Sequence, residues 1–321
     1  TEEEARQYIK VGGGKELKGL SRVVIPYFQV EFVTRNQAQA VSSNTAAYVS
    51  SNLSFSMLGA DDVQFQALTE RIYQNTVSAL QAAGIEVVPL DTLKAQAAYA
   101  ELVTSWARPA PFLLESGGAV RHFFAPQGMD LYFDPGDKRF SLSSNFGSMF
   151  TTKRHAVQLE GELFKATGIP VMRVRYVVEF TSRTESRSSV FSRTAEAKTG
   201  GKAVLSLVPE GTRMMINTTG AQQPDVERDV RPLLLLKAPL QSSDTAWLKD
   251  LREVNAGMNT AKSAGVAVLS TAAALSGFGK ATAVSIKDYE IEVDAAAYAE
   301  AVTALTDRAT QMFLLQVQAL R

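Results

Sequence analysis

The chain has 321 residues, of which 45% are hydrophobic and 21% charged. This length and composition predict a soluble globular protein with a sizeable core and argue against disorder or a fibrous repeat. The 33 basic and 33 acidic residues cancel, so no overall field favours nucleic acid. With no cysteine and only His122 and His155 as histidines, disulfides, thiolate catalysis, zinc fingers and three-histidine metal sites are excluded.

Residues 1–20 are predicted to be a flexible lead-in, with a short helix over 2–9 that Gly12 to Gly14 interrupt. Residues 21–108 are predicted to form the first half of an α/β core. Its expected elements are strands at 23–33, 53–57 and 85–88, a helix from Asp61 or Asp62 to Ala83 with Gly84 behind it, and a helix from Asp91 to Trp106.

Residues 109–160 interrupt this pattern. Glycine, proline and aspartate break up short aromatic runs there, which predicts an irregular insertion that carries a hairpin. Regular structure returns over 161–245, the second, strand-rich half. We expect a helix at 161–167, a strand at 171–180 with Arg173 and Arg175 on its polar face, and strands at 203–208, 213–216 and 233–236.

The last segment, 246–321, combines an Ala/Gly-rich stretch at 256–283 with a strand at 286–293 and a long terminal helix that Asp294 caps. The Ser/Thr/Arg-rich stretch 181–199 is either a flexible loop or a long hairpin that orders on assembly. Together the elements predict a mixed α/β fold: a mixed β-sheet flanked by helices, a hairpin-bearing insertion and a long C-terminal helix.

No catalytic, cofactor-binding or metal-binding residue is predicted. The sequence lacks the G-x-S-x-G, H-E-x-x-H, C-x-x-C and G-x-G-x-x-G signatures, which argues against an enzyme. An enzyme without a recognisable motif stays open as a third hypothesis, with Asp130, Asp134 and Asp137 as its best acids.

Charge is segregated along the chain although it sums to zero. Residues 139–202 hold eleven basic and five acidic residues, whereas 287–307 hold one basic and six acidic residues. Opposed patches suit a self-complementary assembly or a protein partner, so Arg173, Arg175, Glu290 and Glu292 are the candidate interface. The alternative is that the two segments pair within one monomer.

A second hypothesis is an extracytoplasmic ligand-binding module, of the carbohydrate-binding type. Its stacking platform would be Phe123, Phe124, Tyr132 and Phe133, although aromatic residues of this kind more often pack in the core. The uncharged stretch 263–279 is short for a spanning helix, and its small residues leave membrane contact open beside ordinary burial.

The run from Arg22 to Leu102 resembles the α/β half of the curli-secretion-channel and TolB N-terminal-like group of bacterial envelope proteins. The resemblance rests on Val23-Val24-Ile25-Pro26 opening a strand, on the helix that ends Ala79-Leu80-Gln81-Ala82-Ala83-Gly84, and on the strand Ile85-Glu86-Val87-Val88. Gly168-Ile169-Pro170-Val171 resembles the approach to the next strand, so about half the chain is covered.

This resemblance implies a non-enzymatic envelope protein that acts in assembly, export or structural scaffolding through protein–protein contacts. The chain starts at Thr1 without an apolar leader, which fits either a processed mature form or a trimmed one. We therefore expect a periplasmic or outer-membrane-associated location and no nucleic-acid partner.

Overall fold

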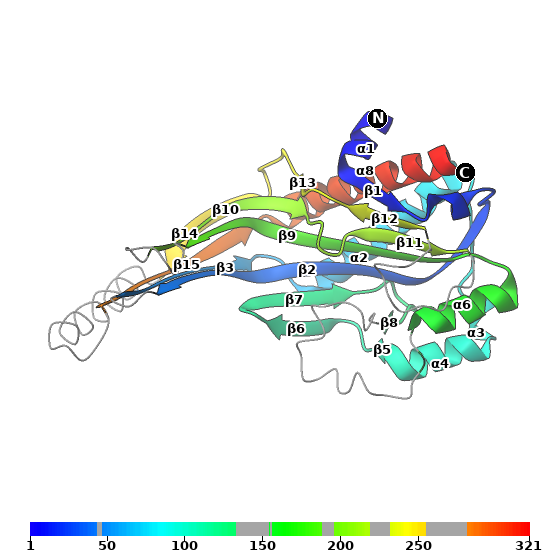
Figure 1. Cartoon of the computed structure of the whole chain (residues 1–321), viewed down its shortest axis with the longest axis horizontal. Helices are drawn as coiled ribbons and strands as arrows, with labels where there is room; N and C mark the ends of the chain where they lie inside the picture. The colour runs from blue at the N-terminus through cyan, green and yellow to red at the C-terminus, as the bar shows by residue number, and fades with distance from the viewer. Residues whose placement is uncertain (44–46, 133–153, 155, 188–195, 219–231, 255–280) are drawn as a thin grey trace.

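The computed structural model describes residues 1–43, 47–132, 154, 156–187, 196–218, 232–254 and 281–321 (Figure 1). Its helices are α1 (Glu2–Tyr8), the 3-10 helix η1 (Gly14–Leu17), α2 (Asp62–Ala82), α3 (Asp91–Lys94), α4 (Ala97–Trp106), α6 (Ala156–Thr167) and α8 (Ala295–Leu320). The strands are β1 (Ile9–Gly12), β2 (Arg22–Ser43), β3 (Ala47–Leu58), β4 (Glu86–Val88), β5 (Ala107–Arg108), β6 (Phe112–Ser116), β7 (Ala119–Phe124), β8 (Leu131–Tyr132), β9 (Val171–Arg187), β10 (Ala197–Leu207), β11 (Arg213–Asn217), β12 (Leu233–Leu236), β13 (Leu240–Gln241), β14 (Leu248–Val254) and β15 (Ala281–Val293).

One mixed sheet of 13 strands organises the chain, and this confirms the predicted α/β class. Its main path runs β1-β12-β11-β9-β2-β3-β15-β14, and β4, β6, β7, β10 and β13 attach to it from the side. The β2–β9 and β3–β15 pairs are parallel, whereas β2–β3 and β9–β10 are antiparallel.

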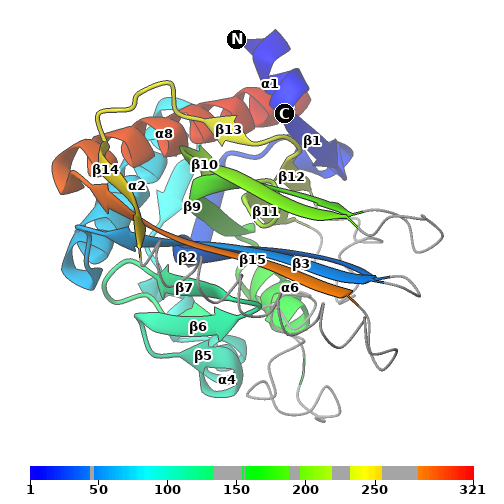
Figure 2. The same cartoon turned by 90° about the vertical axis from the view of Figure 1, so that its left-hand side faces the viewer.

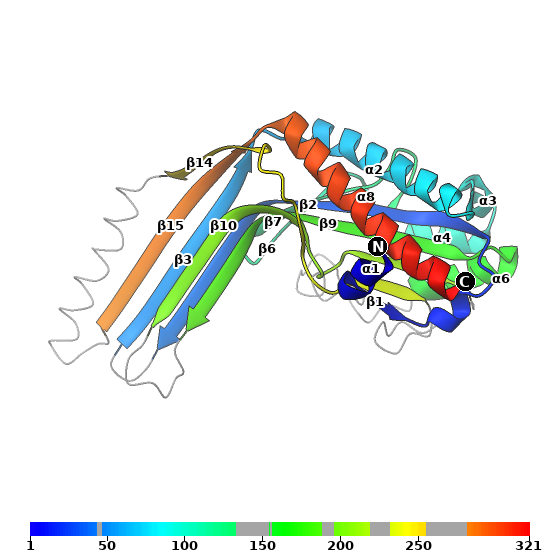
Figure 3. The same ribbon diagram turned by 90° about the horizontal axis from the view of Figure 1, so that it is seen from above.

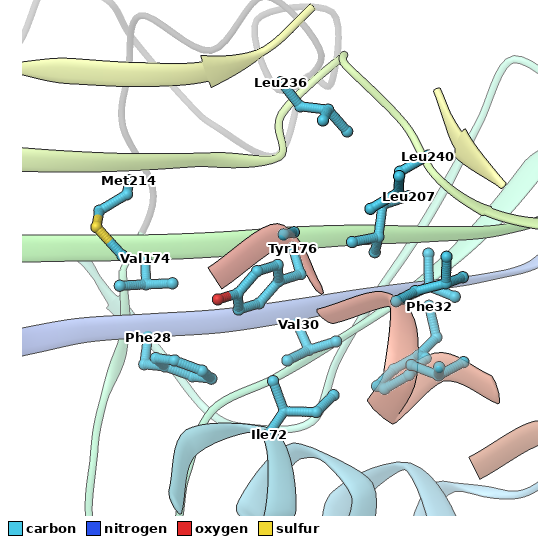
Figure 4. Packing of buried hydrophobic residues seen from close by; sticks show 14 of the residues in the cluster. Phe28, Val30, Phe32, Ile72, Val174, Tyr176, Leu207, Met214, Leu236 and Leu240 are labelled. Carbon is cyan, nitrogen blue, oxygen red and sulfur yellow. The ribbon is translucent and has the colours of Figure 1, made fainter. Parts of the chain in front are cut away.

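Helices α2 and α8 lie together over one face of this sheet (Figures 1 and 3). Alternate residues of β2 and β9 point towards them, including Phe28, Phe32 and Tyr176, which are all fully buried (Figure 4). Phe32 stacks on Phe65 of α2 with ring centroids 4.4 Å apart. This packing of helix on sheet forms the main core of the part that we call the body.

The predicted ends of these helices are confirmed. Asp61 caps α2 through its side chain, which accepts a hydrogen bond from the Gln64 amide, and Gly84 follows with a positive φ of 72°. Asp294 caps α8 in the same way, through the Ala297 amide.

A smaller layer covers the other face of the body. Tyr99 of α4 and Leu163 of α6 belong to a second core cluster with Tyr27 of β2, and the two helices pack against each other. Between Pro109 and Arg154 the structure describes β6 and β7, which pair as the predicted hairpin, and α6 begins at Ala156, earlier than expected.

Beyond the body the long strands continue as an arm, which we define as residues 35–43 of β2, 47–56 of β3, 179–187 of β9, 197–204 of β10 and 281–289 of β15 (Figures 1 and 3). The β9–β10 pair lies above β2, β3 and β15, so the arm has two layers (Figure 2). Between the layers, Ser51 hydrogen-bonds Thr199 at 2.8 Å, and Phe55 packs against Gly201. At about 3.3 Å per residue, the arm part of β2 is about 30 Å long.

The arm starts where β2 changes its neighbour. Val30 pairs with both β9 and β7, and Arg35 pairs with both β7 and β3. Because a strand has only two edges, β9 and β3 must use the same edge of β2 in turn. The two strands part after the Phe32–Val178 pair, and β3 takes the place that β9 leaves.

The structure corrects the prediction that residues 1–20 are a flexible lead-in. Ala5 and Leu17 are fully buried, β1 pairs with β12, and Glu4 is bonded to Arg308 of α8. In the stretch 181–199, the described residues form the end of β9 and the start of β10. These two strands pair antiparallel, as the hairpin alternative predicts. Residues 263–279 lie outside the described part of the chain. Among the described helices, none is both long enough and apolar enough to cross a membrane.

Candidate functional site

Charged side chains occupy the face of the body sheet that is turned away from α2 and α8. Residues 23–33 of β2 are all buried, including the polar Gln29 and the acidic Glu31. On β9 the alternating positions Arg173 and Arg175 are only 4% and 2% exposed. A buried charge is unfavourable unless it is paired, so each must have a partner.

Glu31 is the centre of the first buried cluster. Its carboxylate accepts from Arg175 Nη2 at 2.6 Å and lies 3.1 Å from Nε of Arg121 on β7. Glu31 is fully buried, so two guanidinium groups replace the water that this carboxylate would otherwise bind.

Glu160 of α6 is the centre of the second cluster. It accepts hydrogen bonds from Nε of Arg173 and, at 2.8 Å, from the Tyr132 hydroxyl. The Arg173 guanidinium also lies 5.4 Å from the Tyr27 ring centroid and 5.3 Å from that of Tyr132. Burial, with the Glu160 carboxylate beside it, raises the pKa of Tyr132 well above its usual value, so this hydroxyl stays a donor.

These two clusters join separate elements of the body, across 13 residues of sequence between Glu160 and Arg173 and across 144 between Glu31 and Arg175. Glu160 brings α6 onto β9, and Arg121 brings β7 onto β2, so both act as fixed links within the body. Neither cluster includes a cysteine or histidine, and each carboxylate is already engaged by a cation. The geometry therefore supports a structural role.

This placement corrects two sequence-based predictions. Arg173 and Arg175 face the interior of the body and offer no contact surface, because another layer covers their side of the sheet. Phe123, Phe124 and Tyr132 are each at most 1% exposed and belong to the core, so they offer no stacking face to a ligand. Phe133 lies outside the described residues.

Glu290 and Glu292, the other half of the predicted interface, are on the surface and paired within the chain. Arg252 Nη2 of β14 bonds Glu290 at 2.7 Å, and Lys249 Nζ bonds Glu292 at 2.5 Å. The Lys249 hydrogen bond and charge lower the pKa of Glu292. Glu300 of the same acidic segment pairs with Arg71 of α2, so its described ion-pair partners come from β14 and α2, outside the basic segment 139–202.

Among the described residues, the acids and histidines that a metal site or acid–base catalysis would need do not form a cluster. His122 Nδ1 lies 2.9 Å from Asp62, and Asp130 is described, whereas Asp134, Asp137 and His155 are not. Within the described ranges, no three His, Cys, Asp or Glu residues come close enough together to hold a metal ion.

The arm presents a feature that the sequence did not single out, an open strand edge. Residues 197–203 of β10 pair with β9 on one side, and no strand among the described residues pairs with the other side. Lys198 and Lys202 are exposed along it. Gly200 and Gly201 were the available signal, because glycine inside a strand marks the close approach of another group; a Cβ at Gly201 would lie 2.7 Å from Phe55.

The junction between arm and body holds a groove of about 400 Å³. Most of its lining residues carry polar side chains, and they come from β9, β10, β13 and their flanks: Glu179, Thr181, Ser182, Arg183, Glu185, Ser206, Val208, Pro239 and Gln241. Asn36 of β2 reaches this region, donating to Glu179 at 3.3 Å and to Thr181 at 3.2 Å. We call the set Asn36, Glu179 and Thr181 the junction cluster.

Comparison with known proteins adds no relative to this description. No protein-family model, curated protein or solved structure matches the chain.

Proposed function

We propose that the protein is a non-enzymatic component of the bacterial cell envelope that acts in assembly, export or scaffolding through protein–protein contacts made by its arm. The observation that carries this proposal is the arm itself, which projects from the body and has an open edge on β10. An unpaired strand edge is a template for another chain, and natural proteins usually cover such edges. The envelope location rests on the sequence resemblance alone.

The chemistry of the edge favours an ordered partner over uncontrolled aggregation. Lys198 and Lys202 repel a second like-charged edge, so the strand that pairs here should carry acidic groups. The surface of β14 fits this requirement, since Asp250 and Glu253 are exposed there while its two cations already pair with β15. A second copy of the chain could therefore supply the complementary surface.

The test is the mass in solution, measured by size-exclusion chromatography with light scattering at low and high salt. We expect the wild-type chain to self-associate at low salt, and the double variant Lys198→Glu/Lys202→Glu to be shifted to the monomer. The matched control Lys10→Glu/Lys18→Glu makes the same charge change on exposed residues of the body and should associate like the wild type. A wild-type monomer at every salt and protein concentration would overturn self-association through this edge.

The location is tested independently by fractionating cells that produce the protein from its own full gene. Recovery with the periplasm or outer membrane supports the proposal, and recovery in the cytoplasm contradicts it.

A further inference from the structure

The two layers of the arm contain different numbers of described strands. The lower layer is formed by β2, β3 and β15, paired side by side in that order, and the upper layer by β9 and β10. The junction cluster ties β9 to β2, and the contacts of Thr199 with Ser51 and of Gly201 with Phe55 set β10 over β3. Seen from above, the arm part of β15 lies outside the area that β9 and β10 cover (Figure 3).

The burial of the lower layer shows where this cover ends. Paired residues of neighbouring strands lie on the same face of a sheet. Two rows of such residues cross the three strands of the lower layer: Ala40, Ser51 and Ser285, and Ala38, Leu53 and Lys287. In both rows the residues of β2 and β3 are at most 7% exposed, whereas Ser285 and Lys287 of β15 are exposed.

The exposed ends of both rows nevertheless face the upper layer. Ser51, which shares its row with Ser285, hydrogen-bonds Thr199 of β10 at 2.8 Å. Leu53 lies two residues further along β3 on the same face, so Lys287 points to the same side. The sandwich is therefore open above β15, where one more strand of the upper layer would lie.

The open edge of β10 borders this uncovered face. Residues 197–203 pair with β9 on one side, and β13 pairs with the other side of β10 only at Ser206 and Leu207. A strand added to this edge would lie about 4.8 Å further out, over β15 and the adjoining side of β3. We call the edge of residues 197–203 together with Ser285 and Lys287 the third-strand site.

The third-strand site carries positive charge on both sides of the space for the added strand. Thr199 and Gly201 face the lower layer, so Lys198 and Lys202 stand on the opposite face of β10, while Lys287 lies below. Lys198 has only an exposed pair with Glu196 at 3.7 Å, which is weak. Among the described residues, no ion pair engages Lys202 or Lys287. An occupant with acidic side chains on both of its faces complements these lysines.

We propose that the third-strand site binds an extended acidic segment of a partner protein, which adds to β10 and completes the upper layer of the arm. This inference rests on the proposed function and names the chemistry of the partner. Strand addition supplies main-chain hydrogen bonds, and the lysines above and below select for acids. Strand β14 of a second copy fits less well, because Arg252 shares one face with Asp250, and Leu251 shares the other with Glu253.

Fluorescence anisotropy with a labelled peptide tests the site. The probe is about seven residues long, to match 197–203, and repeats two threonines and two glutamates, so that acids lie on both faces of the extended chain. It is titrated with wild-type protein below the concentration at which the chain self-associates. We expect binding of this peptide, no binding of the same peptide with lysine in place of glutamate, and slower hydrogen exchange at residues 197–203 when the acidic peptide is added.

The lower side of the site is tested by two substitutions on β15. Lys287→Glu should weaken peptide binding at least about tenfold, because it places like charges together. The matched control Lys10→Glu reverses an exposed charge on β1 and should leave binding unchanged. Ser285→Trp fills the space above β15 and should also weaken binding, whereas Ser285→Ala keeps the space open and should bind like the wild type.

The outcomes separate this inference from the proposed function. If Lys198→Glu/Lys202→Glu loses the peptide while Lys287→Glu and Ser285→Trp keep it, the edge is used without β15; the third-strand site is then wrong, and contacts through the arm still stand. If wild-type protein does not bind the acidic peptide, or binds the lysine peptide equally well, the acidic partner is wrong. The mass measurement then decides the proposed function by itself.

Discussion

The same strand, β2, is built in two different ways in the body and in the arm. From Val23 to Val33 it is covered on both faces and buried without interruption, whereas from Arg35 to Ser43 buried and exposed residues alternate. The buried residues of β2 include Phe28 and Phe32 in the body, whereas in the arm they are Asn36, Ala38, Ala40 and Ser42. One continuous strand thus passes from a region that apolar burial stabilises to a region where hydrogen bonds and small side chains set the contacts.

This difference shows that the stability of the protein is not uniform along its strands. Buried apolar area contributes about 25 cal/mol per Å². The arm has less of it than the body, because its buried side chains other than Leu53, Phe55 and Phe180 are small or polar. Regions with few apolar contacts open at lower free energy than the core. The arm should therefore open locally while the body remains folded, and three variants test this contrast.

The largest effect is expected for Arg173→Met in the body. The substitution leaves Glu160 buried without its cation, which costs about 3–5 kcal/mol of unfolding free energy. Urea denaturation followed by circular dichroism should show this loss as a lower midpoint for the whole protein. The double variant Arg173→Met/Glu160→Gln removes the unpaired charge and keeps an acceptor for the Tyr132 hydroxyl, so it should be more stable than the single variant. Equal destabilisation of both would show that charge burial is not the cause.

A smaller and local effect is expected for Gly201→Val in the arm. The new side chain collides with Phe55 between the layers, and overpacking of this kind costs about 1–3 kcal/mol. Hydrogen exchange should rise in β3 and β10 and stay unchanged in α2. Lys202→Val, which changes an exposed neighbour, serves as the control. If hydrogen exchange rises in α2 as well as in the arm, the arm and the body unfold as one cooperative unit and the arm does not open independently.

The smallest effect is expected for Glu290→Gln on β15. The Arg252–Glu290 pair lies on the surface, where solvent screens it and two long side chains must be ordered to form it. The urea midpoint should not change measurably, and Glu292→Gln should behave likewise. A shift as large as that of Gly201→Val would mean that the β14–β15 charges support the arm after all.

Elements whose signals are local could be predicted from the sequence. Helix α2 is an example, because Asp61 caps its first turn, a stripe of apolar residues follows, and Gly84 provides the left-handed residue after its end. The strand at 171–180 was also expected, and its alternation of apolar and charged residues set the correct period.

The site could not be predicted in the same way, because its partners come from distant parts of the chain. Alternation made Arg173 and Arg175 look solvent-facing, yet Glu160 and Glu31 meet them through tertiary contacts, the latter across 144 residues of sequence. Glu31 inside the apolar run 23–33 was the one available sign, since an acid in such a run needs a buried cation. The arm was harder still to predict from the sequence, because its polar strands have the composition of a loop.

The shared edge of β2 also matters for the order in which the chain folds. Strand β3 begins four residues after β2 ends and can form a hairpin with it within microseconds, whereas β9 arrives more than a hundred residues later. If β3 continued pairing past Arg35, it would occupy the edge that Val24–Phe32 must offer to β9. Gly59 follows the last residue of β3 and has a φ of 91°, which favours glycine. A Cβ at this position would lie 2.5 Å from the Val293 carbonyl oxygen, so the two backbones are in close contact here. The turn at this glycine ends β3 and so limits how far the early hairpin with β2 can extend before β9 arrives.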